Sequence, residues 1–474
     1  MRKLGRAAAI LAGALTCHAL PASAQMEIVR ADQVTNRAGV TLFVTRGTIM
    51  VPAVRGDERP GDAPVKVAFV RISRAVQPSE TATFVLAGGP GGSGIGIAES
   101  IVRNGDDALF DMFGGDVIGM DQRGTGASTP APYFPAPYDL PLDVPGSPAA
   151  WLPIIAPQIR AAAAEMRAQG IRPEMFATRE AADDIDMIRS GLGYARMNLF
   201  GSSYGSHLAL SVLRHHGDRV NRVVLIGPEG PDDSWKLPDH VDAAIARIGA
   251  AIGDPDLPDR MRRVIGRLRE APVTVPVMLA SGVEQDVTLG AFDLQYLSYS
   301  QPSGREGLIT LARQYRAMEA GDFSQMAWSA MRVRQNMSTW YAMSQITDIA
   351  AGASAERAAA IDAQAPDSIL GNAINFPDRA LADAWGVTPE PAAERAPIHS
   401  DVPVLILVGD LDMRTPIENG EALIETLPNG HLVVVENAAH QFDIFGSPEI
   451  RGVIAPFIAG EPVTVERITL PVGQ

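Results

Sequence analysis

The sequence predicts an α/β fold, in which a mostly parallel sheet flanked by helices carries an inserted helical cap. The apolar run at residues 197–200 passes through a glycine-rich turn into a helix-like stretch at residues 207–213. The continuous apolar run at residues 403–408 is typical of a parallel strand that is buried on both faces. Residues 231–399 contain helix-like stretches and little strand alternation, which favours a cap between two parts of one core.

The turn after residue 200 reads Gly201-Ser202-Ser203-Tyr204-Gly205 and has the form Gly-x-Ser-x-Gly. The flanking glycines let the backbone turn sharply without a Cβ clash, which exposes the central side chain at the end of the strand. Ser203 is therefore the candidate nucleophile. Because a lone match to this pattern is often only a glycine-rich turn, the prediction depends on partners further along the chain.

A serine hydroxyl needs a base that takes its proton and an acid that orients the base. The apolar run at residues 403–408 ends in Gly409-Asp410-Leu411-Asp412. A carboxylate just past the carboxyl end of a buried strand lies where open α/β sheets place their sites. We favour Asp412 over Asp410, because Asp412 lies further into the loop and directly before the turn.

The candidate base is His440, which stands in the loop after a predicted strand at residues 431–435. His431 begins that strand and is the less favoured alternative. The chain order Ser203, Asp412, His440 is one of the orders in which Ser-His-Asp triads occur. The order and the placement at strand ends therefore both agree with a catalytic triad.

Acyl transfer also needs backbone N–H groups that stabilise negative charge on the carbonyl oxygen. A predicted strand leads into the glycine-rich loop at residues 87–94. We assign Gly89 as the first donor of this oxyanion hole, with Gly88 as the alternative, and the N–H of Tyr204 as the second donor. A phosphate-binding loop fits poorly, because a Gly-Lys-Ser/Thr ending is missing and Pro90 removes one donor.

Four segments together resemble the proline iminopeptidase and tripeptidyl aminopeptidase group of α/β-hydrolases. They are residues 88–94, residues 121–126, residues 201–205, and residues 409–416 taken with His440. The resemblance implies an α/β-hydrolase fold with a helical cap. It also implies hydrolysis of a peptide bond near a free N-terminus, through an acyl-enzyme on serine.

The resemblance further implies that carboxylates of the cap bind the ammonium group of the substrate. Glu229, at the mouth of the predicted cap, is the favoured candidate. Weaker candidates are Asp232, Asp233 and Glu319.

Asp121 and Arg123 lie in the second of the four segments, beside the proposed oxyanion loop. We expect both side chains to tie loops together by hydrogen bonds and charge pairing rather than to act in catalysis.

The chain departs from the usual family pattern at Leu86-Ala87, before the glycine-rich loop, and at Ser202, before the nucleophile. Neither change removes a catalytic group, but both alter the pocket beside the oxyanion hole. The substrate therefore stays open between two classes. One is a peptide with a free amine, and the other is a small ester or amide that the same triad would cleave in an esterase or amidase.

The first 24 residues have the features of a secretory signal peptide. Arg2, Lys3 and Arg6 form a basic start, an apolar core follows, and Ala22-Ser23-Ala24 is a cleavage site. We therefore expect an exported protein, either periplasmic or secreted. The predicted organisation is a signal peptide at residues 1–24, a first core part at 25–230, a cap at 231–399 and a second core part at 400–474.

The chain of 474 residues has a formal net charge of −15 at pH 7. Such an acidic surface argues against nucleic-acid binding and against stable association with anionic membranes. The only cysteine, Cys17, lies in the predicted leader, so the exported protein would have no disulfide and no thiolate metal site. Because zinc-binding motifs are also missing, we expect no metal or cofactor, and the expected partner is a peptide or small acyl substrate.

Overall fold

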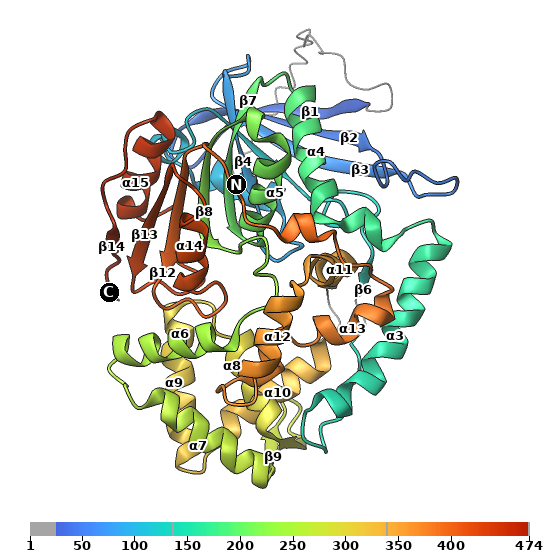
Figure 1. Cartoon of the computed structure of the whole chain (residues 1–474), viewed down its shortest axis with the longest axis vertical. Coiled ribbons are helices and arrows are strands. Elements are labelled where there is room, and N and C mark those ends of the chain that lie inside the picture. The colour runs from blue at the N-terminus through green and yellow to red at the C-terminus, as the bar shows by residue number, and fades with distance from the viewer. Residues whose placement is uncertain (1–24, 135–136, 338–339, 473–474) are drawn as a thin grey trace, which may run out of the picture.

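The computed structural model describes residues 25–134, 137–337 and 340–472, so the predicted signal peptide lies outside the described residues. Ten strands of the described chain form one sheet, in the order β1-β2-β3-β5-β4-β7-β8-β12-β13-β14 (Figure 1). The strands of this sheet are β1 (Met26–Thr35), β2 (Thr41–Val51), β3 (Val65–Ser73), β4 (Thr81–Leu86), β5 (Asp116–Met120), β7 (Arg196–Ser203), β8 (Val220–Pro228), β12 (Val404–Gly409), β13 (Gly430–Glu436) and β14 (Arg467–Thr469).

The strands from β5 across to β14 run parallel to one another. At the other edge β1, β2 and β3 pair antiparallel, and β3 also pairs antiparallel with β5. Parallel strands are covered by helices on both faces, which explains why their sequences are continuous apolar runs. In β12, for example, all the residues are buried. The mostly parallel sheet that the sequence predicts is confirmed.

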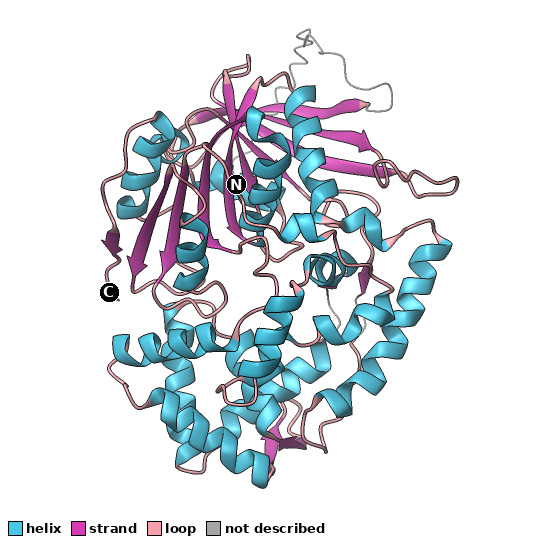
Figure 2. Cartoon of the chain, viewed as in Figure 1, coloured by secondary structure: helices cyan, strands magenta, loops and turns pink. Residues whose placement is uncertain are grey.

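Helices cover both faces of this sheet, as Figure 2 shows. Alternate side chains of β12 belong to different hydrophobic clusters, Ile406 to one and Leu405 to the other. The first cluster includes side chains of α4 (Thr178–Gly191), α5 (Tyr204–His216) and α14 (Ile417–Ile424), and the second includes side chains of α1 (Gly94–Asn104), α2 (Asp107–Asp111) and α15 (Pro448–Ala459).

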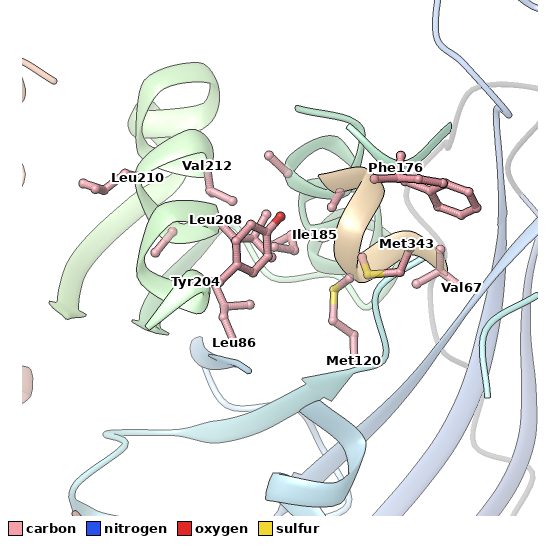
Figure 3. Packing of buried hydrophobic residues seen from close by; sticks show 14 of the residues in the cluster. Val67, Leu86, Met120, Phe176, Ile185, Tyr204, Leu208, Leu210, Val212 and Met343 are labelled. Carbon is pink, nitrogen blue, oxygen red and sulfur yellow. The ribbon is translucent and has the colours of Figure 1, made fainter. Parts of the chain in front are cut away.

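Figure 3 shows part of the first cluster, around the residue that follows the candidate nucleophile. The ring of Tyr204 lies among Leu86 of β4, Ile185 of α4 and Leu208 of α5. Its hydroxyl is 3.2 Å from the Oγ1 of Thr178, and the side chain is buried. Since this side chain is anchored in the core, the backbone of the turn before α5 is fixed in place.

A helical segment lies between β8 and β12 and fills the lower half of the molecule in Figure 1, below the sheet. It has its own hydrophobic cluster, which is built mainly from α6 to α10. The helices of this segment are α6 (Pro238–Ala251), α7 (Leu257–Glu270), α8 (Ala291–Ser300), α9 (Arg305–Glu319), α10 (Ser324–Asn336), α11 (Ala342–Ala351), α12 (Ala355–Gln364) and α13 (Asp378–Trp385), with short 3-10 turns at Gly371–Asn375 and Ala392–Arg395. The inserted helical cap of the predicted fold is therefore present.

Two features of the cap differ from the sequence analysis. A hairpin of β9 (Val273–Met278) and β10 (Glu284–Leu289) lies within it, although Pro276 in β9 argues against a strand from sequence alone. The long helix α3 (Pro148–Ala168), which precedes the nucleophile strand, packs against α13. The helical half of the molecule thus also includes α3, a segment that precedes the turn at residue 203. Between these parts, β6 (Tyr133–Phe134) pairs with β11 (Trp340–Tyr341), and a 3-10 turn occupies Pro173–Phe176.

Candidate active site

Ser203 ends β7 and stands directly before α5, in the strand–turn–helix context that the sequence predicts. Its backbone has φ 54° and ψ −129°, a region that residues other than glycine rarely adopt. A strained turn of this kind is the geometry of a nucleophile elbow, which exposes the hydroxyl at the end of the strand.

The flanking glycines of this turn are required by close packing. A Cβ at Gly201 would clash with the carbonyl oxygen of Gly205, and a Cβ at Gly205 would clash with the carbonyl oxygen of Leu86. The Gly-x-Ser-x-Gly pattern therefore lets α5 approach both its own strand and the end of β4.

His440, in the loop after β13, forms a hydrogen bond through Nδ1 with the Oδ2 of Asp412 at 2.8 Å. The Nδ1 atom also lies 3.2 Å from the Oγ1 of Thr415. When the Nδ1 proton is donated to the carboxylate, the lone pair of Nε2 is free to accept a proton from another group. This is the orientation that a general base requires.

Asp412, in the loop after β12, is only 1% exposed and accepts several hydrogen bonds. Besides His440, its carboxylate accepts from the backbone N–H of Arg414 at 2.7 Å, the backbone N–H of Thr415 at 3.0 Å and the Thr415 hydroxyl at 2.6 Å. Burial is the largest single influence on the pKa of Asp412 and would raise it, but His440 and Thr415 together hold this pKa below its ordinary value. The carboxylate is therefore ionised and fixed in orientation.

The less favoured alternatives lie elsewhere. Asp410 forms no hydrogen bond or ion pair with His440 in the described chain. Burial raises the pKa of its carboxyl group, whose Oδ1 has no hydrogen-bond partner among the described residues. His431 bonds through Nε2 to the carbonyl oxygen of Val465 at 2.7 Å, at the start of β13. The structure thus brings Asp412 and His440 together and leaves out Asp410 and His431.

Gly227 of β8 is a residue of this site that the sequence analysis missed. Its φ is 52°, and a Cβ there would lie 2.8 Å from the Thr415 Oγ1 and 3.3 Å from the Asp412 Oδ2. A side chain at this position would therefore push against the carboxylate that holds His440. No local motif marks this glycine, because its neighbours come from loops far along the chain.

The glycine-rich loop after β4 lies against the candidate nucleophile. A Cβ at Gly88 would lie 2.9 Å from the Cβ of Ser203, so the loop approaches this closely only because residue 88 is a glycine. The N–H of Gly89, the assigned first oxyanion donor, bonds to no protein acceptor in the described chain, and both glycines line the same cavity as Ser203. Gly89 and Gly88 both remain compatible with the role of first donor, beside the N–H of Tyr204.

Asp121 and Arg123 tie loops together, as the sequence analysis expects. Asp121 accepts from the Ser93 hydroxyl at 2.5 Å, and from the backbone N–H of Ala127 at 2.9 Å. The buried guanidinium of Arg123 donates twice to Asp184, each time at 2.7 Å, and also to backbone carbonyls. Neither residue lines the Ser203 cavity.

Ser203 and His440 line one cavity of about 660 Å³ between the sheet and the cap. The core contributes Gly88, Gly89, Ser203, Arg414, Thr415, His440 and Gln441 to its wall. The cap contributes polar and aromatic side chains, among them Trp235, Lys236, Tyr296, Tyr299, Asp348, Phe376 and Asp378. A substrate bound there would meet the serine hydroxyl, the imidazole and several buried charges.

Glu229, the favoured candidate for binding the substrate ammonium, lines this cavity, but its carboxylate is already bonded within the protein. It accepts from Lys236 Nζ at 2.8 Å and from the Ser234 hydroxyl at 3.1 Å. Burial would raise the pKa of Glu229, but Lys236 and its other neighbours hold it below the ordinary value. Because Lys236 already neutralises it, Glu229 is a poor partner for the ammonium group of a substrate.

The three weaker candidates are also engaged. Asp232 accepts from the hydroxyl and the backbone N–H of Ser354, both at 2.6 Å. Asp233 pairs with Arg357 at 2.8 Å, and Glu319 pairs with arginines of α7. None of the three lines the Ser203 cavity.

Asp348 of α11 and Asp378 at the start of α13 are the carboxylates that the sequence analysis missed. Both line the cavity, and neither lies within ion-pair distance of an arginine or lysine in the described chain. Burial first, and then the charges of Asp378 and Glu229, raise the pKa of Asp348 well above its ordinary value. Burial also raises the pKa of Asp378 to about 7. A cation that enters the cavity would stabilise the ionised form of both carboxyl groups and so lower their pKa values.

Other kinds of site have no support in the part of the chain that the structure describes. Over residues 25–134, 137–337 and 340–472, no three His, Cys, Asp or Glu side chains are placed to hold a metal ion. No helix in these ranges is long and apolar enough to span a bilayer.

A family model described as alpha/beta hydrolase fold matches residues 84–446 of the chain. The matched range begins in β4 and ends after His440, so it includes the glycine-rich loop, the elbow and the loop of Asp412.

Two curated proteins match part of the chain. The tripeptidyl aminopeptidases of Streptomyces lividans and Streptomyces coelicolor are each 29% identical to it over 194 residues. The match covers 37% of this chain and 34% of each of those proteins, so only about a third of the length of these relatives is represented.

Solved structures of similar proteins are more distant. The proline iminopeptidase of Mycobacterium smegmatis has a TM-score of 0.41 and 15% identity, over 87% of this chain and 97% of that chain. A thermophilic esterase of Thermogutta terrifontis has a TM-score of 0.35 and 16% identity, over 91% of this chain and 98% of that chain. Structural similarity at this low level says nothing about the substrate.

The contacts of His440 predict that Asp412→Asn and Asp410→Asn differ sharply. Asp412→Asn should lower kcat by about 10⁴-fold, close to the loss in Ser203→Ala, because an amide no longer holds the Nδ1 proton and the ring turns to the wrong tautomer. Asp410→Asn should keep most of the activity. The measurement is kcat for a chromogenic ester, with circular dichroism to confirm folding, and a similar kcat for the two Asn variants would contradict the assignment.

Proposed function

Since the chain belongs to the alpha/beta hydrolase fold family, we propose that it is a serine hydrolase and, more specifically, an aminopeptidase that releases N-terminal residues or short peptides. Ser203, His440 and Asp412 are its catalytic triad. Gly89, or Gly88, and Tyr204 supply the backbone N–H groups of its oxyanion hole. The single observation that carries the choice of substrate is that two acidic side chains without an ion-pair partner in the described chain, Asp348 and Asp378, line the cavity of the nucleophile. The carboxylate of Asp378 accepts one hydrogen bond, from Gln345 at 3.3 Å.

The proposed reaction passes through an acyl-enzyme. The oxygen of Ser203 attacks the carbonyl carbon while its proton passes to Nε2 of His440, whose Nδ1 lies 2.8 Å from Asp412. The imidazolium then gives that proton to the departing nitrogen as the C–N bond breaks. Water attacks the resulting ester, losing a proton to the same ring, and the ring returns it to the serine oxygen.

The acidic pair favours a substrate with a free amine over a neutral ester. Two carboxyl groups with raised pKa in one enclosed cavity are costly to ionise without a counter-ion. The N-terminal ammonium group of a peptide would be such a counter-ion. If the acidic pair lies a short distance from Ser203, only peptide bonds near that N-terminus can reach the serine oxygen. The 29% identity to tripeptidyl aminopeptidases over part of the chain supports the same choice.

We also propose that the protein is exported through the leader at residues 1–24, which has a basic start, an apolar core and a cleavage site at Ala24. Expression of the full chain in a Gram-negative host should yield a periplasmic protein whose first residue is Gln25. Recovery from the cytoplasm with Met1 retained would contradict this proposal. The same chain without residues 1–24 is the control, because it shows how much protein reaches the periplasmic fraction without a leader.

Blocking the substrate amine tests the proposed function. N-acetylation of a good peptidyl-p-nitroanilide should lower kcat/KM by about 100-fold, because the ammonium group loses its charge-assisted bonds to the acidic pair. In Asp348→Asn and Asp378→Asn the free-amine substrate should lose activity and approach the acetylated one.

A matched control is Asp362→Asn, which removes a carboxylate paired with Arg379 on the cap surface. It should leave the preference for a free amine unchanged. Equal rates with free and blocked amines in the unaltered enzyme would show that the protein is an esterase or amidase with the same triad.

The pKa of about 7 for Asp378 predicts a pH dependence of substrate binding. The carboxyl group is neutral below its raised pKa, so it attracts an ammonium group fully only above about pH 7. KM for a free-amine peptide should therefore rise, by up to about tenfold, as the pH falls from about 8 to about 6. The acetylated substrate, which has no ammonium group, is the reference, and parallel KM profiles for both substrates would contradict the role of Asp378.

A further inference from the structure

Arg414 is a cation of the Ser203 cavity that the proposed reaction does not use. It follows Asp412 in the loop after β12, and its side chain lines the same 660 Å³ cavity as Ser203 and His440. Lys236, also on the cavity wall, is already paired with Glu229 at 2.8 Å. No carboxylate of the described residues lies within ion-pair distance of Arg414.

The hydrogen bonds of Arg414 leave donors unused. Its Nη2 donates to the backbone carbonyl of Ser300 at 2.6 Å, and its guanidinium carbon lies 6.0 Å from the centre of the Tyr299 ring. Its Nε is buried without a hydrogen-bond partner in the described chain, and the same is true of the Ser300 hydroxyl. A ligand in the cavity cannot reach either of these two atoms, because both are enclosed by protein. The Nη1 of Arg414 also forms no hydrogen bond in the described chain but is not enclosed in this way, so it is the donor that a ligand in the cavity can use.

A purely structural role explains only part of this arrangement. The bond from Nη2 to Ser300 ties the loop of Asp412 to the end of α8. That bond uses one of the five N–H donors of a guanidinium. It gives no reason for the unused Nη1, or for a permanent charge on the wall of the Ser203 cavity.

Acidic groups and a cation thus line the cavity from different elements. Asp348 and Asp378 come from the cap helices α11 and α13, whereas Arg414 comes from the core loop after β12. Tyr296 lies within reach of both kinds of charge. Burial is the main cause that raises the pKa of its hydroxyl, Asp378 raises it further and Arg414 lowers it. A ligand with an ammonium group at one end and an anion at the other matches this distribution.

We propose that Arg414 binds the C-terminal carboxylate of a short peptide whose ammonium group lies at Asp348 and Asp378. This inference rests on the proposed function and narrows its substrate class to peptides of a few residues with both termini free. The planar fork of a guanidinium suits the task, because it donates two parallel hydrogen bonds to a carboxylate. Long chains, which bring no carboxylate into the cavity, are poorer substrates.

Binding of four forms of trialanine to the Ser203→Ala protein tests the proposal without cleavage. The amine is free or acetylated, the carboxylate is free or amidated, and isothermal titration calorimetry gives each Kd. Amidation should raise Kd by about tenfold or more, which is the expected effect of losing a charge-assisted hydrogen bond. The added change Arg414→Gln should abolish the difference between acid and amide and leave the Kd of the amide unchanged.

Arg379→Gln is the matched control. Arg379 lines a neighbouring cavity of about 520 Å³ and pairs with Asp362 at 2.6 Å, so its loss should leave the preference for the acid intact. The proposal is overturned if amidation has no effect in the Ser203→Ala protein, a result that needs no Arg414 variant to fold. It is equally overturned if Arg414→Gln weakens the acid and the amide alike, as a structural role requires.

Acetylation of the amine and amidation of the carboxylate test the proposed function and this inference separately. An effect of amidation without an effect of acetylation would keep the carboxylate site and contradict the aminopeptidase. An effect of acetylation alone would keep the aminopeptidase and contradict the role of Arg414. Failure of all four peptides to bind would overturn both.

Discussion

The site depends on one constraint, which is that β4, β7, β8, β12 and β13 run parallel and end at the same edge of the sheet. Each loop at that edge brings its residues to one place, so Gly88, Ser203, Asp412 and His440 meet although they lie far apart in the chain. Gly227, at the end of β8, completes the arrangement because it leaves room for the carboxylate that holds the imidazole.

The cap converts this edge into an enclosed cavity, and enclosure determines the electrostatics. In a setting with little water, a charge is tolerated when a partner neutralises it. Lys236 does this for Glu229. Asp348, Asp378 and Arg414 form no ion pair among the described residues, so two acidic groups of the cap and one cation of the core loop line the same cavity without such a partner. That distribution connects the proposed aminopeptidase activity with the proposed preference for short peptides.

The residues predicted from sequence share one property, which is a local pattern that ties them to the end of a strand. Ser203 is marked by its glycines, and Asp412 is marked by the apolar strand before it. Glu229, predicted to bind the substrate ammonium, lines the cavity, but its pairing with Lys236 was not foreseen. Asp348 lies on an ordinary amphipathic helix, and nothing in its neighbours distinguishes it from a solvated acid.

The sequence by itself determined the fold class, the parallel strands and the order of the candidate triad, because hydrophobic periodicity and glycine turns are local properties of the chain. Only the tertiary structure decided which charges face the nucleophile and which of them are paired. Those pairings join segments such as α11, α13 and the loop after β12, whose distance in space depends on how the cap packs on the sheet. Burial and the absence of a counter-ion are properties of that packing, and they determine how the cavity treats a charged substrate.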